Sequence, residues 1–186
     1  MPNERRVLSS IALAAMLTFG GCVTPELLSG RVSTAAYTAP ATGSSFVVVG
    51  ADAASLSLVE KEVQRLLTGQ MIALGFKRAE NRESADLAVL YSYEIGAGTT
   101  KVSSSPDFVF GGHRVESRTS YPRVFQIAVV DLKASRPAND VKVVWQGELY
   151  SSGPIQDMGT LARHFIEEIF KHFGKSETNR HFAKVI

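Results

Sequence analysis

The sequence contains a single cysteine among its 186 residues, Cys22, so a disulfide within the chain is excluded. It also lacks the GxSxG, GxGxxG and Walker sequences, which argues against a serine-hydrolase elbow and a glycine-rich phosphate cradle. The formal net charge is only +2 at pH 7, so nothing indicates a nucleic-acid partner. No apolar run reaches the ~20 residues that a membrane-spanning helix needs. These absences leave an apolar core as the source of stability.

The N-terminal segment has the features of a bacterial export signal. Arg5 and Arg6 are followed by an apolar run over residues 7–19, and two glycines then lead into Cys22. A positive start, a short apolar stretch and small residues before a cut site are typical of secretory signals. We therefore predict that residues 1–21 are a signal peptide.

Residues 17–22 resemble the lipobox of bacterial lipoproteins, apart from Phe19, where leucine is usual. The resemblance implies that Cys22 carries a diacylglycerol and a further acyl chain, which together anchor a protein durably. In such lipoproteins an aspartate after the cysteine marks inner-membrane retention, and here that residue is Val23. The resemblance therefore implies a lipid anchor on the periplasmic face of the outer membrane.

Three further segments are predicted from composition. Residues 22–44 are rich in Thr, Ala, Ser, Gly and Pro without a sustained period, so we interpret them as the lipidated cysteine and a flexible tether. Residues 45–174 hold the periodic apolar patterns of one folded domain. Residues 175–186 are interpreted as a loose C-terminal tail.

The folded domain is predicted to be an α+β two-layer sandwich. A β-branched strand at residues 46–49, a helix over 58–74 with capping-box spacing from Ser57 to Glu60, and an alternating strand over 86–95 form a parallel βαβ unit. Strands at 124–132 and 141–150 form an antiparallel hairpin. A second helix, ending at Gly174, covers the same face of the mixed sheet as the first.

This arrangement is similar to that of the bacterial lipoproteins called domain of unknown function 4136, over about residues 45–174. The similarity depends on the sequences ADLAV at 85–89, VVD at 129–131 and VWQG at 144–147, on the first helix ending LGF at 74–76, and on FG at 173–174. The connector at 134–140 is longer than the family's usual tight turn. The resemblance implies a fold and a location but no catalytic residue and no cofactor.

The sequence contains few groups of residues that could form a metal-binding or catalytic site. His164, Glu168 and His172 are spaced by four residues on the second helix and are weak candidates for a metal site, which would need further ligands from another element. Asp131 stands at a strand end, where capping a turn is the more common role than catalysis. The sequence therefore predicts neither an enzyme nor a resident metal.

An excursion hairpin over residues 97–122, turning at Gly111 and Gly112, contains the apolar triplet Phe108, Val109 and Phe110. This triplet has little local shelter, so it is a candidate partner surface, although packing in an edge strand is an open alternative. We expect a non-enzymatic envelope lipoprotein that binds another protein or an envelope polymer through a sheet edge or this hairpin. The alternative is a ligand-binding, metal-binding or hydrolytic periplasmic domain that uses the second helix.

Overall fold

The computed structural model describes residues 26–50, 57–106, 113–138 and 140–186. They form an open mixed sheet of eight strands with three helices. Its strands are β1 (Leu27–Ala36), β2 (Ser45–Val49), β3 (Lys77–Arg78), β4 (Leu87–Ile95), β5 (Thr99–Pro106), β6 (His113–Asp131), β7 (Val143–Gly153) and β8 (Glu177–Val185). The helices are α1 (Leu58–Ala73), α2 (Leu132–Ala138) and α3 (Met158–Phe170).

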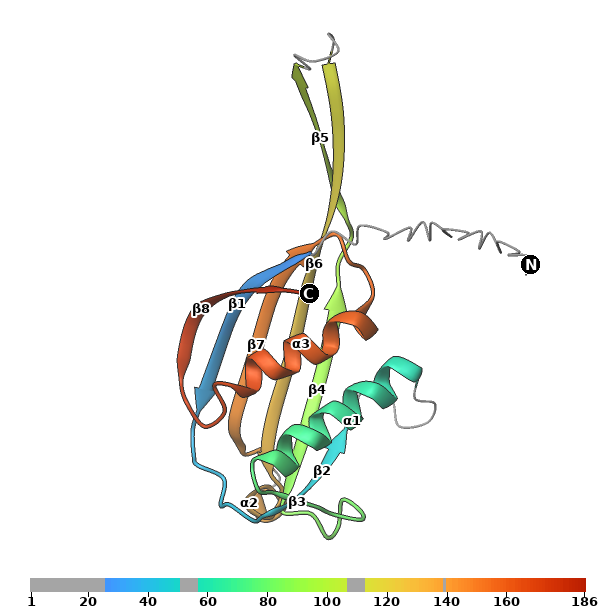
Figure 1. The fold of residues 1–186 in the computed structure, drawn as a ribbon. Coiled ribbons are helices and arrows are strands. Elements are labelled where there is room, and N and C mark those ends of the chain that lie inside the picture. Colours follow the sequence, from blue (N-terminus) through green and yellow to red (C-terminus); the bar gives the residue numbers. More distant parts are fainter. Residues whose placement is uncertain (1–25, 51–56, 107–112, 139) are drawn as a thin grey trace, which may run out of the picture.

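The strand order is β3-β2-β4-β6-β7-β1-β8, and β5 pairs only with the outer part of β6. The pairing of β2 with β4 is parallel across α1, whereas β4–β6, β6–β7 and β1–β7 are antiparallel. Both α1 and α3 lie against one face of the sheet (Figure 1). The predicted α+β sandwich, with its βαβ unit and its antiparallel strands, is therefore confirmed.

The core lies between that sheet face and the two helices. Trp145, Phe125 and Phe165 are fully buried there, and Phe125 and Phe165 meet edge to face with centroids 6.4 Å apart. The predicted start of the first helix is confirmed, because Ser57 and Glu60 form a capping box at α1. Asp157 caps α3, for which the sequence analysis predicted only the end. Gly75 and Gly174 follow the two helices at φ 88° and 73°, values that glycine adopts without strain.

The prediction that residues 22–44 are a flexible tether is wrong over the strand β1. This strand lies inside the sheet between β7 and β8, and Leu28 and Val32 are buried in the core. Its composition hides the pattern, since Gly30 and Thr34 interrupt the core-facing series of Leu28, Val32 and the small Ala36. The phenyl ring of Phe182 covers Gly30 so closely that a Cβ there would lie 2.8 Å from a ring carbon.

The prediction of a loose C-terminal tail at residues 175–186 is wrong as well. Residues 177–185 form β8, which pairs antiparallel with β1. Phe182 and Ile186 pack against the core, and Lys184 between them is half-buried and pairs with Glu167 of α3 at 3.0 Å. The connector at 134–140, expected to be a loop, is largely taken up by α2, whose first residue Leu132 is buried against Ala88 and Val130.

Candidate functional site: a protruding β-arm

The most exposed part of the sheet is the ribbon formed by β5 and the first half of β6, which we call the arm. It pairs in continuous antiparallel register from Thr99 opposite Ser120 to Pro106 opposite His113. Figure 1 shows the arm extending beyond the sheet and both helices, with no third strand beside it. Every residue of β5 is exposed, so the arm has no core of its own.

The arm has one charged face and one uncharged face, because directly opposite residues in a ribbon share a face. Lys101 lies opposite Arg118, and the same face carries Glu116 and Arg114. Arg114 is paired with Glu116, at 3.2 Å between Nε and Oε1. The other face carries Pro106, His113, small polar side chains and two valines, Val102 and Val115, that are 68% and 65% exposed.

The base of the arm is built from close contacts. The amide of Gly96 donates to the carbonyl of Pro122 at 2.9 Å. A Cβ on Gly98 would lie 2.5 Å from a ring carbon of Tyr121, so only glycine fits beneath that ring. These contacts fix where the arm leaves the sheet.

A buried arginine stands directly below this base. Arg123 is 1% exposed, and its Nη1 and Nη2 donate to the carbonyl of Ile155 at 3.2 Å and to the Ser151 hydroxyl at 3.3 Å. Burial lowers the pKa of Arg123, and the nearby Glu26 carboxylate opposes that shift. Sequence reasoning missed this residue because its neighbours in the strand are apolar and nothing marks it as inward-facing.

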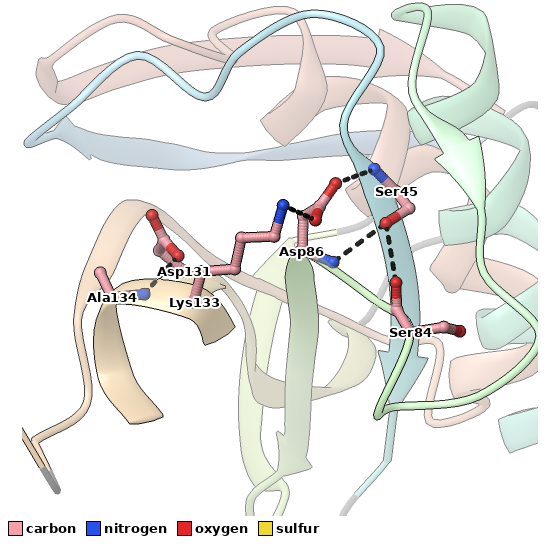
Figure 2. Close-up of polar contacts among 6 residues, drawn as sticks. All are labelled: Ser45, Ser84, Asp86, Asp131, Lys133 and Ala134. Atoms are coloured by element: carbon pink, nitrogen blue, oxygen red, sulfur yellow. Dashed lines mark hydrogen bonds and ion pairs between the residues drawn. The ribbon is translucent and has the colours of Figure 1, made fainter. Parts of the chain in front are cut away.

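A second polar cluster lies at the opposite end of the sheet (Figure 2). One carboxylate oxygen of Asp86 accepts from the Ser45 amide at 2.8 Å, and the other pairs with the Lys133 ammonium at 2.6 Å. The Lys133 and Ser45 contacts lower the pKa of Asp86 from 3.8 to about 2. This cluster ties the start of β2 to the start of β4.

Asp131 has the capping role that is usual at a strand end. Its Oδ1 accepts from the Ala134 amide at 2.9 Å in the first turn of α2 (Figure 2). Asp86 is ion-paired and Asp131 caps a helix, so both carboxylates at this end of the sheet make structural contacts. We call the contacts of Asp86 with Ser45 and Lys133 the clasp.

The sheet face opposite α1 and α3 contains a shallow hollow of about 700 Å³. Three of its polar side chains bond to one another, since Ser92 donates to Gln126 at 3.2 Å and Gln126 donates to Glu148 at 2.7 Å. One solvated polar face is usual for an antiparallel sheet. The hollow therefore needs no ligand to account for its composition.

The predicted site residues have different outcomes. Phe108, Val109 and Phe110, with the turn at Gly111 and Gly112, lie outside the described residues, as does Cys22. The strands on either side of the triplet do form the predicted excursion hairpin.

The three residues predicted as weak metal-site candidates, His164, Glu168 and His172, lie on or just after α3 and do not form a set of metal ligands. Glu168 is buried and paired with Lys171, and the Nδ1 atom of His164 is buried without a partner. Burial lowers the pKa of His164, and Lys184 adds to that effect. Within the part of the chain that the structure describes, no three His, Cys, Asp or Glu side chains gather as metal ligands.

No family profile and no curated protein matches the sequence. Several solved structures have a similar fold. A PDZ domain protein from Parabacteroides distasonis is 11% identical with a TM-score of 0.51, and the match covers 86% of this chain but only 38% of that protein. A DUF4136 family protein from Bacteroides thetaiotaomicron is 19% identical, with coverage of 76% and 94% and a TM-score of 0.44.

The PelC dodecamer from Paraburkholderia phytofirmans is also similar, at 14% identity, 75% and 93% coverage and a TM-score of 0.45. All these identities are low, so the similarities concern the fold alone. One of the matched proteins belongs to the family that residues 45–174 resemble in sequence. Among the described residues, none of the helices combines the length and apolar character needed to cross a membrane.

Proposed function

We propose that this protein is a non-enzymatic lipoprotein of the bacterial envelope, anchored at the periplasmic face of the outer membrane, that acts through contacts made by its arm. The observation that carries the proposal is the arm itself. A two-stranded ribbon without a core is only marginally stable in water, and both of its edges expose unpaired backbone groups. A ribbon of this kind is supported energetically when it lies against another surface.

The anchor is supported by the sequence around Cys22. The charged start, the apolar run and the lipobox resemblance each indicate export followed by acylation at this residue. Val23 in the next position supports the outer membrane as the destination. The function proposed for the folded domain is therefore exercised beside a membrane.

The absence of catalysis is proposed because the polar clusters of the described residues have structural contacts. Asp86 is held by Lys133 and Ser45, and Asp131 caps α2. Glu168 pairs with Lys171 on α3. General acid–base or nucleophilic catalysis needs an acid, a base or a nucleophile positioned in a cleft. The three carboxylates named here form ion pairs or a helix cap instead.

The anchor is tested by Cys22→Ser in the native host. The expected result is loss of the acyl mass on the peptide that contains residue 22, with loss of the protein from sedimented outer membranes. Cys22 is the only cysteine, so no other thiol can replace it. Normal processing and continued sedimentation of the Cys22→Ser protein with outer membranes would contradict the proposal.

The arm is tested by Phe108→Ala combined with Phe110→Ala. We expect weaker crosslinking to envelope components in intact cells and a thermal midpoint close to that of the wild type. The matched control is Phe165→Ala, which removes a phenylalanine that is fully buried in the core and should lower the midpoint strongly. A comparable stability loss in the arm variant would place its phenylalanines in a core and remove the arm from the proposal.

A further inference from the structure

The arm leaves the sheet at the same end at which the chain enters it. Gly30, Ser151 and Arg123 stand in one row across β1, β7 and β6. Three residues farther toward that end are Leu27 on β1 and Ser120 on β6, and Ser120 belongs to the first pair of the arm. Figure 1 accordingly shows β1 beginning beside the base of the arm.

The distance from the anchor to this end is short because β1 begins at Leu27, near the start of the segment that was expected to be a tether. Five peptide steps separate Cys22 from Leu27, which fully extended span about 17 Å. The arm covers seven steps from Thr99 to Pro106, which at strand rise is about 24 Å. The arm is therefore longer than the longest possible link between membrane and domain.

This comparison limits how the domain can stand on a membrane. From Ser120 to Asp131 the body extends roughly 37 Å in the direction opposite to the arm. If the arm pointed away from the membrane, a leaflet within about 17 Å of Leu27 would cut through the body. The arm must then lie along the leaflet or point into its headgroups.

The charged face of the arm suits such a surface. Lys101 and Arg118 are direct cross-strand neighbours, and within the described residues no carboxylate forms an ion pair with either one. Like charges placed directly opposite each other destabilise a ribbon. Anionic headgroups attract basic side chains that lie close to a leaflet, so contact would turn this repulsion into attraction.

We propose that the arm, over residues 99–106 and 113–120, is a membrane-contact element whose face with Lys101, Arg114 and Arg118 rests on anionic phospholipid headgroups. The inference rests on the proposed acylation of Cys22, which supplies the fixed point for the distances. It narrows the surface met by the arm from any envelope component to the leaflet in which the protein is anchored. The uncharged face, with Val102 and Val115, then points away from the leaflet.

The test uses the acylated full-length mature protein, reconstituted into vesicles of phosphatidylethanolamine with phosphatidylglycerol and into vesicles of phosphatidylcholine. Amide hydrogen exchange of the arm is measured in both, and mass spectrometry of the residue-22 peptide records acylation in the same samples. We expect slower exchange of the arm amides in the anionic vesicles. In the double variant Lys101→Gln with Arg118→Gln this protection should fall roughly 25-fold, because each of the two basic side chains near an anionic leaflet shifts the equilibrium by roughly fivefold.

The matched control is Lys77→Gln with Arg78→Gln in β3, which removes two exposed charges from a strand on the far edge of the sheet. Its arm amides should exchange as in the wild type. Acylated protein whose arm exchanges equally in both vesicles would overturn the leaflet contact and leave the anchor standing. Arm protection that appears only when envelope proteins are present would also overturn the leaflet contact, in favour of a protein partner. A residue-22 peptide without lipid would overturn both the leaflet contact and the proposed anchor.

Discussion

The two halves of β6 are parts of one continuous strand of 19 residues, yet they lie in opposite environments. In the inner half, Phe125, Ile127 and Val129 alternate into the core and are at most 2% exposed. In the outer half, the side chains from His113 to Arg118 are all exposed. The backbone pairs on both sides of the inner half, with β4 and β7, and on only one side of the outer half, with β5.

The difference shows that strand pairing and core formation are separable here. The inner half is stabilised by apolar burial, which contributes most of the free energy of a fold. The outer half keeps the pairing without that contribution, so its stability depends on cross-strand contacts such as the 2.8 Å hydrogen bond between the Thr100 and Thr119 hydroxyls. We therefore expect substitutions in the arm to leave the stability of the rest of the sheet almost unchanged. Substitutions in the core should instead destabilise both the core and the arm.

The largest effect should come from truncating a side chain in the inner half. Phe125→Ala removes a ring that is fully buried against Phe165 and Tyr93, so the free energy of unfolding should fall by about 3–5 kcal/mol. Val115→Ala in the outer half should change it by less than about 0.5 kcal/mol. Urea denaturation of both variants measures the two values, and similar losses would mean that arm and body unfold as one unit.

An intermediate effect is expected at the end of the sheet opposite the arm. Because the pKa of Asp86 is about 2 in the folded protein and 3.8 ordinarily, its ionised form stabilises the fold above about pH 4, and this contribution disappears as the pH falls toward 2. Asp86→Asn should cost about 1 kcal/mol at pH 7, allowing for screening by solvent. Denaturation curves over pH 2–7 should converge at the acid end.

The Lys133 contact is the largest cause of that pKa shift, so Lys133→Met supplies the matched variant. It should retain the Ser45 hydrogen bonds to Asp86 and show part of the same pH dependence. A constant gap between wild type and Asp86→Asn from pH 2 to 7 would show that the carboxylate charge is unimportant to the clasp.

The smallest effect is expected in the arm without any membrane. Replacing one of two opposed cations, in Lys101→Gln, should stabilise the ribbon by about 0.2–0.5 kcal/mol at low salt. High salt should remove the gain, because exposed charges are screened over about a Debye length. Amide exchange of residues 99–106 at two salt concentrations measures it, and faster exchange in Lys101→Gln would mean that the lysine stabilises the arm.

The parts of the fold that sequence could predict are those where local signals and core pattern agree. In α1 the capping box at Ser57 and the buried series Val63, Leu67 and Met71 both indicate the same helix. In β4 large apolar side chains recur at every second position from Leu87 to Ile95, and these side chains form the core face of the strand. Such segments can be predicted from local sequence because the apolar residues that stabilise them lie within the segment itself.

The strands β1 and β8 could not be predicted in this way because each one is stabilised mainly by its partners. Leu28 and Val32 gain their burial from α3 and β7. Only glycine fits at position 30, because Phe182 of β8 and the Tyr150 carbonyl of β7 leave no room for a side chain. Arg123 is similar, since its inward orientation depends on Ser151 and Ile155, which lie far along the chain. The candidate site could be predicted only in part for the same reason. The arm was predicted as a hairpin, but its position beside the start of β1 depends on how β1 is placed in the sheet.

The pairing of β1 with β7 and β8 also sets the order in which the sheet can close. The strand β1 has to wait for its partners at residues 143–153 and 177–185, which come much later in the sequence. Contacts of such long sequence separation form slowly, since a long loop must first be closed. A chain interrupted before β8 would leave β1 with an open edge, and its unpaired backbone groups could then pair with another chain.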